Sequence, residues 1–122
     1  MAVDRLSRLK GVGVSGGLLV LEATSFSSRL LGLALLAELP TCTALLISPC
    51  RSVHTFGMRF ALDLLFLDAY GSVIRRVDSV TPRRVVCCRP ARGVLETRAG
   101  EAASFVAALE RGAIALGSPR TA

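Results

Sequence analysis

The most informative part of this sequence is the stretch Ser52-Val-His-Thr-Phe-Gly-Met-Arg-Phe-Ala-Leu-Asp-Leu-Leu-Phe-Leu-Asp-Ala-Tyr-Gly71. It holds the only histidine and four of the six aromatic residues of the sequence. A loop leads into an apolar strand, which we predict over Phe60–Leu67. Asp68-Ala-Tyr-Gly71 has the composition of a hairpin turn, because Asp can accept a turn hydrogen bond and Gly can adopt a positive φ angle.

The predicted strand is apolar on both faces. Leu62, Leu64 and Phe66 fall on one side, and Leu65 and Leu67 share the other side with an aspartate. This pattern is typical of a strand that is buried on both faces. The aspartate in such a strand, Asp63, requires hydrogen-bond partners or a shifted pKa.

The rest of the sequence predicts one mainly β (α+β) domain. Further strands are expected at Gly17–Glu22, Thr43–Ile47, Ser72–Val80, Arg83–Cys88 and Gly93–Thr97. Two short helices are expected, one starting within Thr24–Arg29 and one over Glu101–Glu110, where apolar residues recur at helical spacing. We predict a compact antiparallel β-sandwich, jelly-roll-like or barrel-like domain over residues 17–116. Residues 1–16 are then an N-terminal extension, and residues 117–122 a frayed tail.

Length and charge restrict the class of protein. A chain of 122 residues can bury a core as one domain without metal or disulfides. The net charge of +6 comes mainly from arginine. Nucleic-acid binders interleave basic residues with exposed aromatics, and no aromatic residue lies between Gly71 and Ser104. We therefore expect a solvated arginine-rich face and not a nucleic-acid surface.

The cysteines and the N-terminal segment favour a cytoplasmic protein over a secreted or envelope-associated one. The four cysteines have neither the spacing of a disulfide scaffold nor that of a zinc site; Cys50-x-x-x-His54 is the nearest approach to half a metal site. We expect free thiols, no metal and no cofactor. The apolar residues of Gly11–Leu21 follow basic residues, as in a signal peptide, but glycine and serine interrupt them. Leu30–Ala37 is too short to span a membrane.

Several motifs together resemble the domain of unknown function 192 family. They are Glu22-Ala-Thr-Ser-Phe-Ser-Ser-Arg-Leu-Leu-Gly-Leu33, Cys50-Arg-Ser-Val-His-Thr-Phe-Gly-Met58, Leu62-Asp63, Phe66-Leu-Asp68, Gly71, Ala91-Arg-Gly-Val-Leu-Glu96 and Ala99-Gly100. The resemblance runs from about Gly17 to Ala108. It implies a compact, mainly antiparallel β domain of the sandwich or jelly-roll type with short helices. It implies no established reaction, cofactor or ligand.

The sequence departs from the family pattern in ways that bear on function. Ala61 stands where many relatives have proline. Other branches carry tryptophan at the place of His54 and lack Cys50, so neither residue can serve a chemistry shared by the whole family. Many relatives also begin with a signal peptide or membrane anchor, and we expect this chain to lack one.

The candidate site residues are His54, Thr55, Met58, Arg59, Asp63 and Glu96. In the structural interpretation, Asp63 accepts hydrogen bonds from backbone N–H groups of the Val53–Met58 loop and fixes that loop. In the functional interpretation, Met58 and Phe60 form the floor of a pocket. Asp63, His54 and Arg59 are its polar anchors. Ser52, His54 and Asp63 are also residue types of a hydrolase triad, but no nucleophile elbow accompanies them.

Two functions follow from these interpretations. The first is a non-enzymatic small β-rich binding or accessory module, for a protein partner of the cell envelope or secretion machinery by analogy with relatives that carry signal peptides. The alternative is a small-ligand-binding protein or an enzyme with a pocket at His54 and Asp63.

Overall fold

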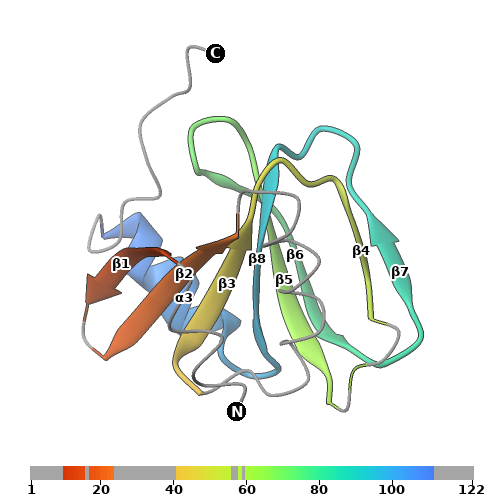
Figure 1. Ribbon diagram of the computed structural model, residues 1–122, viewed down its shortest axis with the longest axis horizontal. Helices are drawn as coiled ribbons and strands as arrows, with labels where there is room; N and C mark the ends of the chain where they lie inside the picture. The colour runs from red at the N-terminus through yellow and green to blue at the C-terminus, as the bar shows by residue number, and fades with distance from the viewer. Residues whose placement is uncertain (1–9, 16, 24–40, 56–57, 59, 112–122) are drawn as a thin grey trace.

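The computed structural model describes residues 10–15, 17–23, 41–55, 58 and 60–111 (Figure 1). Its elements in chain order are β1 (Lys10–Ser15), β2 (Leu18–Ala23), β3 (Thr43–Ile47), β4 (Ser52–His54), β5 (Leu62–Leu67), β6 (Val73–Val80), β7 (Val85–Cys87), β8 (Gly93–Arg98) and α3 (Ala102–Glu110). The described part of the chain is therefore mainly β with one helix, as the sequence predicts in outline.

The strands form two sheets. A six-stranded sheet has the order β1-β2-β3-β8-β5-β6, and β4 pairs with β7 in a two-stranded sheet. β2 and β3 are parallel, whereas the other pairs are antiparallel. The expected purely antiparallel sheet is thus wrong at one pair. The six-stranded sheet is open, with β1 and β6 as its edges, so the barrel-like alternative is not confirmed.

The six-stranded sheet separates two apolar cores because its central strands are apolar on both faces. One core lies against α3 and includes Leu65, Leu95 and Phe105. The core on the opposite face includes Leu64 of β5 and also Val53 of β4, so the β4–β7 sheet packs against part of this second face. In Figure 1, α3 is seen behind the sheet, and β4 and β7 lie to the right of β6. Every residue of β5 is buried, as expected for a central strand.

The turn after β5 has the chemistry that the sequence predicts. The Asp68 carboxylate accepts hydrogen bonds from the backbone N–H groups of Tyr70 at 2.8 Å and Ser72 at 3.0 Å. The Gly71 N–H donates to the Asp68 carbonyl at 3.1 Å. Gly71 has a φ angle of 83°, which favours glycine. The turn prediction is confirmed.

Two strands were not predicted. Lys10–Ser15, which we expected within an N-terminal extension, forms β1 and pairs with β2. Its two glycines lower its strand propensity, so the sequence alone gives little sign of it. β4 lies within the expected loop and has only three residues. The helix expected from Thr24–Arg29 lies outside the described residues.

The other expected strands and the C-terminal helix agree with the structure to within two residues at each end. None of the helical structure in the described ranges is long and apolar enough to cross a membrane.

Candidate functional site

Asp63 is buried on the side of the sheet that faces α3, with 1% of its surface exposed. Its Oδ1 accepts a hydrogen bond from the Ser79 N–H at 2.8 Å. Its Oδ2 accepts from the N–H groups of Gly100 at 2.9 Å and Ala102 at 3.1 Å. Ser79 has a φ angle of 54° and lies at an irregularity in the pairing of β5 with β6. The carboxylate thus joins this irregular part of β6 to the turn before α3 and to the first residue of α3, whose N–H group lacks a helical partner.

These bonds support the structural interpretation of Asp63 but correct its partners. We expected backbone donors from the Val53–Met58 loop. Val53 and Met58 instead belong to the core on the opposite face of the sheet. The difference follows from the alternation of β5, which directs Asp63 toward α3 and Leu62 and Leu64 toward that other core.

Thr55 fixes the described part of the Val53–Met58 loop through hydrogen bonds to Thr81 and Arg84. Its side chain is fully buried. The Thr55 hydroxyl donates a hydrogen bond to the Thr81 carbonyl at 2.7 Å and accepts one from the Arg84 N–H at 2.9 Å. Its backbone N–H donates to the Arg84 carbonyl at 2.9 Å. Thr55 therefore links the end of β4 to the segment that precedes β7.

His54 and Met58 lie in different environments. His54 is an exposed residue of β4 and stands opposite Val85 of β7. Met58 is buried in the core beneath the β4–β7 sheet. The six-stranded sheet separates His54 from the Asp63 carboxylate, so the two residues do not line one pocket. Arg59 lies outside the described residues. Within the described ranges, no three His, Cys, Asp or Glu side chains are grouped to hold a metal ion.

Glu96 lies on the opposite face of the sheet from Asp63. It stands in β8 between Leu45 of β3 and Leu64 of β5, and both leucines belong to the core on the face opposite α3. Glu96 has no exposed surface, and neither carboxyl oxygen has a hydrogen-bond partner within the described residues. The predicted cluster of His54, Asp63 and Glu96 is therefore divided between three places.

Burial determines the protonation of Glu96. The loss of solvation raises the pKa of its carboxyl from 4.5 to about 8. At neutral pH the group is then mainly a neutral carboxylic acid, with one O–H donor and a carbonyl acceptor. Two positions further along the same face, the guanidinium carbon of Arg98 lies 4.1 Å from the centroid of the Phe60 ring.

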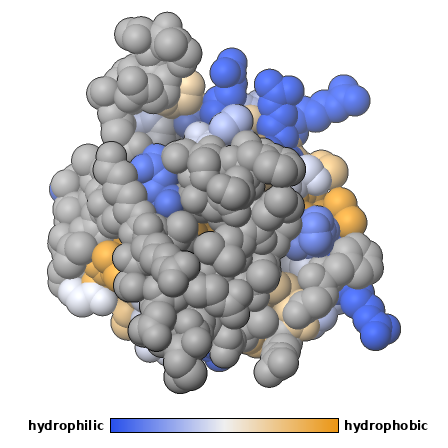
Figure 2. Space-filling model, viewed as in Figure 1, coloured by the Kyte–Doolittle hydropathy of each residue, from blue (hydrophilic) through white to orange (hydrophobic). Residues whose placement is uncertain are grey.

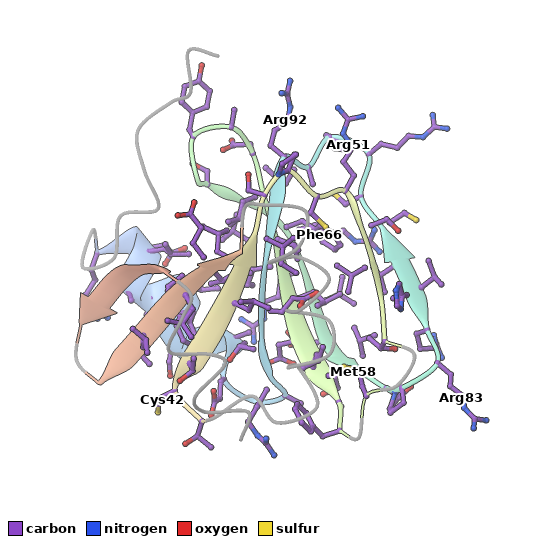
Figure 3. All side chains as sticks on the ribbon, in the orientation of Figure 1. Cys42, Arg51, Met58, Phe66, Arg83 and Arg92 are labelled. Atoms are coloured by element: carbon purple, nitrogen blue, oxygen red, sulfur yellow. The ribbon has the colours of Figure 1, made fainter. Side chains whose placement is uncertain are left out.

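A second candidate site, which the sequence did not predict, lies at one end of the molecule. We call it the arginine end and define it by Arg51, Tyr70, Arg89 and Arg92. These residues belong to the turns that follow β3, β5 and β7. All four side chains are exposed, and Tyr70 is 64% exposed. Figure 3 shows Arg51 and Arg92 pointing away from the body at the same end, where Figure 2 shows several hydrophilic side chains projecting.

Backbone hydrogen bonds hold the three turns of the arginine end together. The Cys50 N–H donates to the Arg92 carbonyl at 3.1 Å, and the Cys88 N–H donates to the Arg51 carbonyl at 2.8 Å. The Arg92 N–H donates to the Leu67 carbonyl at 2.8 Å, which connects the turn that carries Tyr70. In the sequence these residues lie in three separate segments. The strand order of the sheet is what shows that Tyr70 lies at the same end of the molecule as the arginines.

An open mixed β-sheet with a helix on one face and a second small sheet on the other defines this chain as a small β-rich domain. The sequence profile of the DUF192 family, described as "Uncharacterized ACR", matches residues 15–111. The chain belongs to this family, and the resemblance found in the sequence is confirmed. The family is uncharacterised, so membership assigns no specific function. No protein with curated function matches the chain.

Two crystal structures have a similar fold. One is a "putative transcription regulator" from Sinorhizobium meliloti, with a TM-score of 0.61 and 22% identity over 72% of this chain and 74% of that protein. The other is a protein of unknown function from Novosphingobium aromaticivorans, with a TM-score of 0.60 and 18% identity over 78% of this chain and 75% of that protein. At these identities the similarity establishes the fold alone.

Proposed function

We propose that this protein is a non-enzymatic binding module that recognises an acidic segment of a protein partner through the arginine end. The observation that supports this function most directly is the convergence of Arg51, Arg89, Arg92 and Tyr70 on three connected turns. In this interpretation the two sheets are the layers of a sandwich, and the arginine end is one rim of it. The alternative pocket at His54 and Asp63 loses support, because the sheet separates these residues.

The charges of the arginine end are available to a partner. None of its three guanidinium groups forms an ion pair with a described residue; the salt bridge in the described ranges joins Arg76 to Asp78 on β6. The nearby Asp68 carboxylate is engaged by its own turn. Arginine binds carboxylates through paired hydrogen bonds, and arginine and tyrosine are enriched among the residues that dominate protein interfaces.

A protein partner suits this surface better than a nucleic acid. Proteins that bind single strands stack successive bases on several aromatic side chains. Tyr70 is the one exposed aromatic residue of the arginine end. The Sinorhizobium protein is described as a transcription regulator, but a similarity at 22% identity establishes a common fold and not a common ligand. The test below therefore also measures binding of a nucleic acid.

The test measures binding of a fluorescein-labelled peptide of repeated Glu-Glu-Ser units by fluorescence anisotropy. We expect binding that weakens as salt rises, because exposed charges are screened. The triple variant Arg51→Glu, Arg89→Glu and Arg92→Glu should lose it. A triple variant with the same charge change elsewhere, Arg83→Glu, Arg84→Glu and Arg111→Glu, should keep most of it; Figure 3 shows Arg83 far from Arg51 and Arg92.

Two outcomes would overturn the proposal. Equal loss of peptide binding in both triple variants would mean that net charge alone attracts the peptide. Tighter binding of a labelled single-stranded oligonucleotide than of the peptide, lost in the first triple variant, would assign the arginine end to nucleic acid. Circular dichroism of each variant verifies that it is folded.

We also propose a cytoplasmic location. Its support is the state of the cysteines: all four are free thiols, and two of them, Cys42 and Cys87, are exposed. Exposed thiols persist in a reducing compartment. Fractionation of cells that produce the full protein tests this location, and recovery of the protein outside the cytoplasmic fraction would refute it.

A further inference from the structure

We propose that Glu96 is an internal binding site for a small, uncharged, apolar molecule that carries one hydrogen-bonding group. The site is the part of the core on the face of the six-stranded sheet opposite α3 that contains Glu96, Leu45 and Leu64. It is separate from the arginine end, and the inference does not depend on the function proposed for that surface.

The contrast between two buried carboxyl groups supports this inference. Asp63 and Glu96 are both almost fully buried, and they stand on adjacent strands. Asp63 accepts three backbone hydrogen bonds, whereas both oxygens of Glu96 have no partner in the described ranges. Native proteins leave few buried polar groups without partners, and each one costs about 1–3 kcal/mol of stability. A ligand that bonds to Glu96 would remove this cost.

The surroundings define the chemistry of the ligand. The side chains on either side of Glu96 are aliphatic, so a charged ligand would lose its hydration without compensation. A neutral carboxylic acid offers one O–H donor and one carbonyl acceptor side by side. An amide or urea group carries the complementary N–H donor and carbonyl acceptor. The fitting ligand class is therefore an apolar molecule with an amide or urea group.

The row of side chains on this face of β8 indicates where the site approaches solvent. It runs from buried Val94 through Glu96 to Arg98, which is only half-buried. Arg98 covers the ring of Phe60, which is also half-buried. The stack of Arg98 on Phe60 is thus the part of the row nearest to solvent, and a small molecule would reach Glu96 past it.

The test uses N,N′-diisopropylcarbodiimide, which is itself small, uncharged and apolar. A protonated carboxyl adds across one C=N bond: the carboxyl oxygen bonds to the central carbon, and the proton moves to nitrogen. The adduct rearranges to an N-acylurea that retains the whole reagent, so no group leaves. Peptide mass spectrometry of the folded protein should find this adduct at Glu96 and not in the Glu96→Gln variant. Labelling of the exposed Glu110 is the reference for the reactivity of a solvated carboxyl group at each pH.

The matching urea, 1,3-diisopropylurea, has the shape of the reagent and cannot react. It should reduce labelling of Glu96 severalfold while leaving the labelling of Glu110 unchanged. An absence of adduct at Glu96 in the folded protein below neutral pH would overturn the proposal, because it would show that small apolar molecules do not reach the acid. Labelling of Glu96 that the urea does not reduce would overturn it too, because it would show access without a binding site.

Discussion

The substitution Glu96→Gln isolates the energetic consequence of a buried acid. Glutamine has nearly the same shape as glutamic acid and does not titrate. In the folded protein the pKa of Glu96 is raised from 4.5 to about 8 by burial. At about 1.4 kcal/mol per pH unit, this difference corresponds to about 5 kcal/mol. Small domains have a free energy of unfolding of about 5–15 kcal/mol, so one residue can determine whether the protein stays folded at alkaline pH.

The direction of the effect follows from where the proton is lost. As pH rises above 4.5, the unfolded chain releases the Glu96 proton while the folded protein retains it, so unfolding becomes more favourable. The wild-type protein should therefore lose stability progressively between pH 4.5 and about 8, and the loss should be complete above that range. The Glu96→Gln variant lacks this contribution, so its stability relative to wild type should rise across the same range and then level off.

Urea unfolding followed by far-ultraviolet circular dichroism measures both proteins, since the chain contains no tryptophan. The informative quantity is the difference between their unfolding free energies at each pH, because it cancels the groups that the two proteins share. A difference that stays constant from about pH 5 to about pH 9 would refute the reasoning, as it would mean that Glu96 is already ionised or already solvated in the folded protein.

Three further substitutions test the structural roles by urea unfolding at neutral pH. Asp63→Asn should lower the free energy of unfolding by about 2–4 kcal/mol, because an amide NH2 would then face backbone donors. The matched exposed change Asp78→Asn should lower it by less than about 1 kcal/mol, and similar losses in the two variants would contradict the role of Asp63. Thr55→Val preserves side-chain shape and should cost about 1–3 kcal/mol, and an unchanged stability would show that its two bonds are dispensable. Gly100→Ala should lower the free energy of unfolding by about 1–2 kcal/mol, because the φ angle of 94° disfavours residues other than glycine even though a Cβ would meet open space. An unchanged stability would show that the turn adapts.

The sequence predicted those parts of the fold whose signals are local. The turn at Asp68–Gly71 was predictable because its side-chain and glycine chemistry lies within four residues. The apolar residues on both faces of Phe60–Leu67 likewise predicted a strand buried on both faces. β1 escaped prediction because alternating glycine and valine resemble a loop, and only pairing with β2 fixes its structure.

The candidate sites depended on information that no single segment contains. The face on which each carboxyl lies could be predicted for Asp63 within its own strand, but not relative to Glu96, because that requires the register of β5 against β8. The pairing of Leu64 with Glu96 places the two acids on opposite faces. The sequence does not predict the arginine end for the same reason: the adjacency of β5 and β8 brings the turns that carry Tyr70 and Arg92 to the same end of the molecule.

The bonds that satisfy Asp63 also keep Glu96 in the apolar core. The N–H groups of Gly100 and Ala102 bind the Asp63 carboxylate, and the Ala99 N–H donates to the Ala61 carbonyl at 3.1 Å. These contacts fix the end of β8 against the start of β5. A slip of β8 by one residue would bring Glu96 to the α3 face but would break them and reverse every side chain of the strand. The fold therefore cannot relieve the buried acid by changing register. Since an aliphatic residue would fill the position without an unpartnered polar group, packing alone gives no reason for an acid there, and ligand binding at Glu96 does.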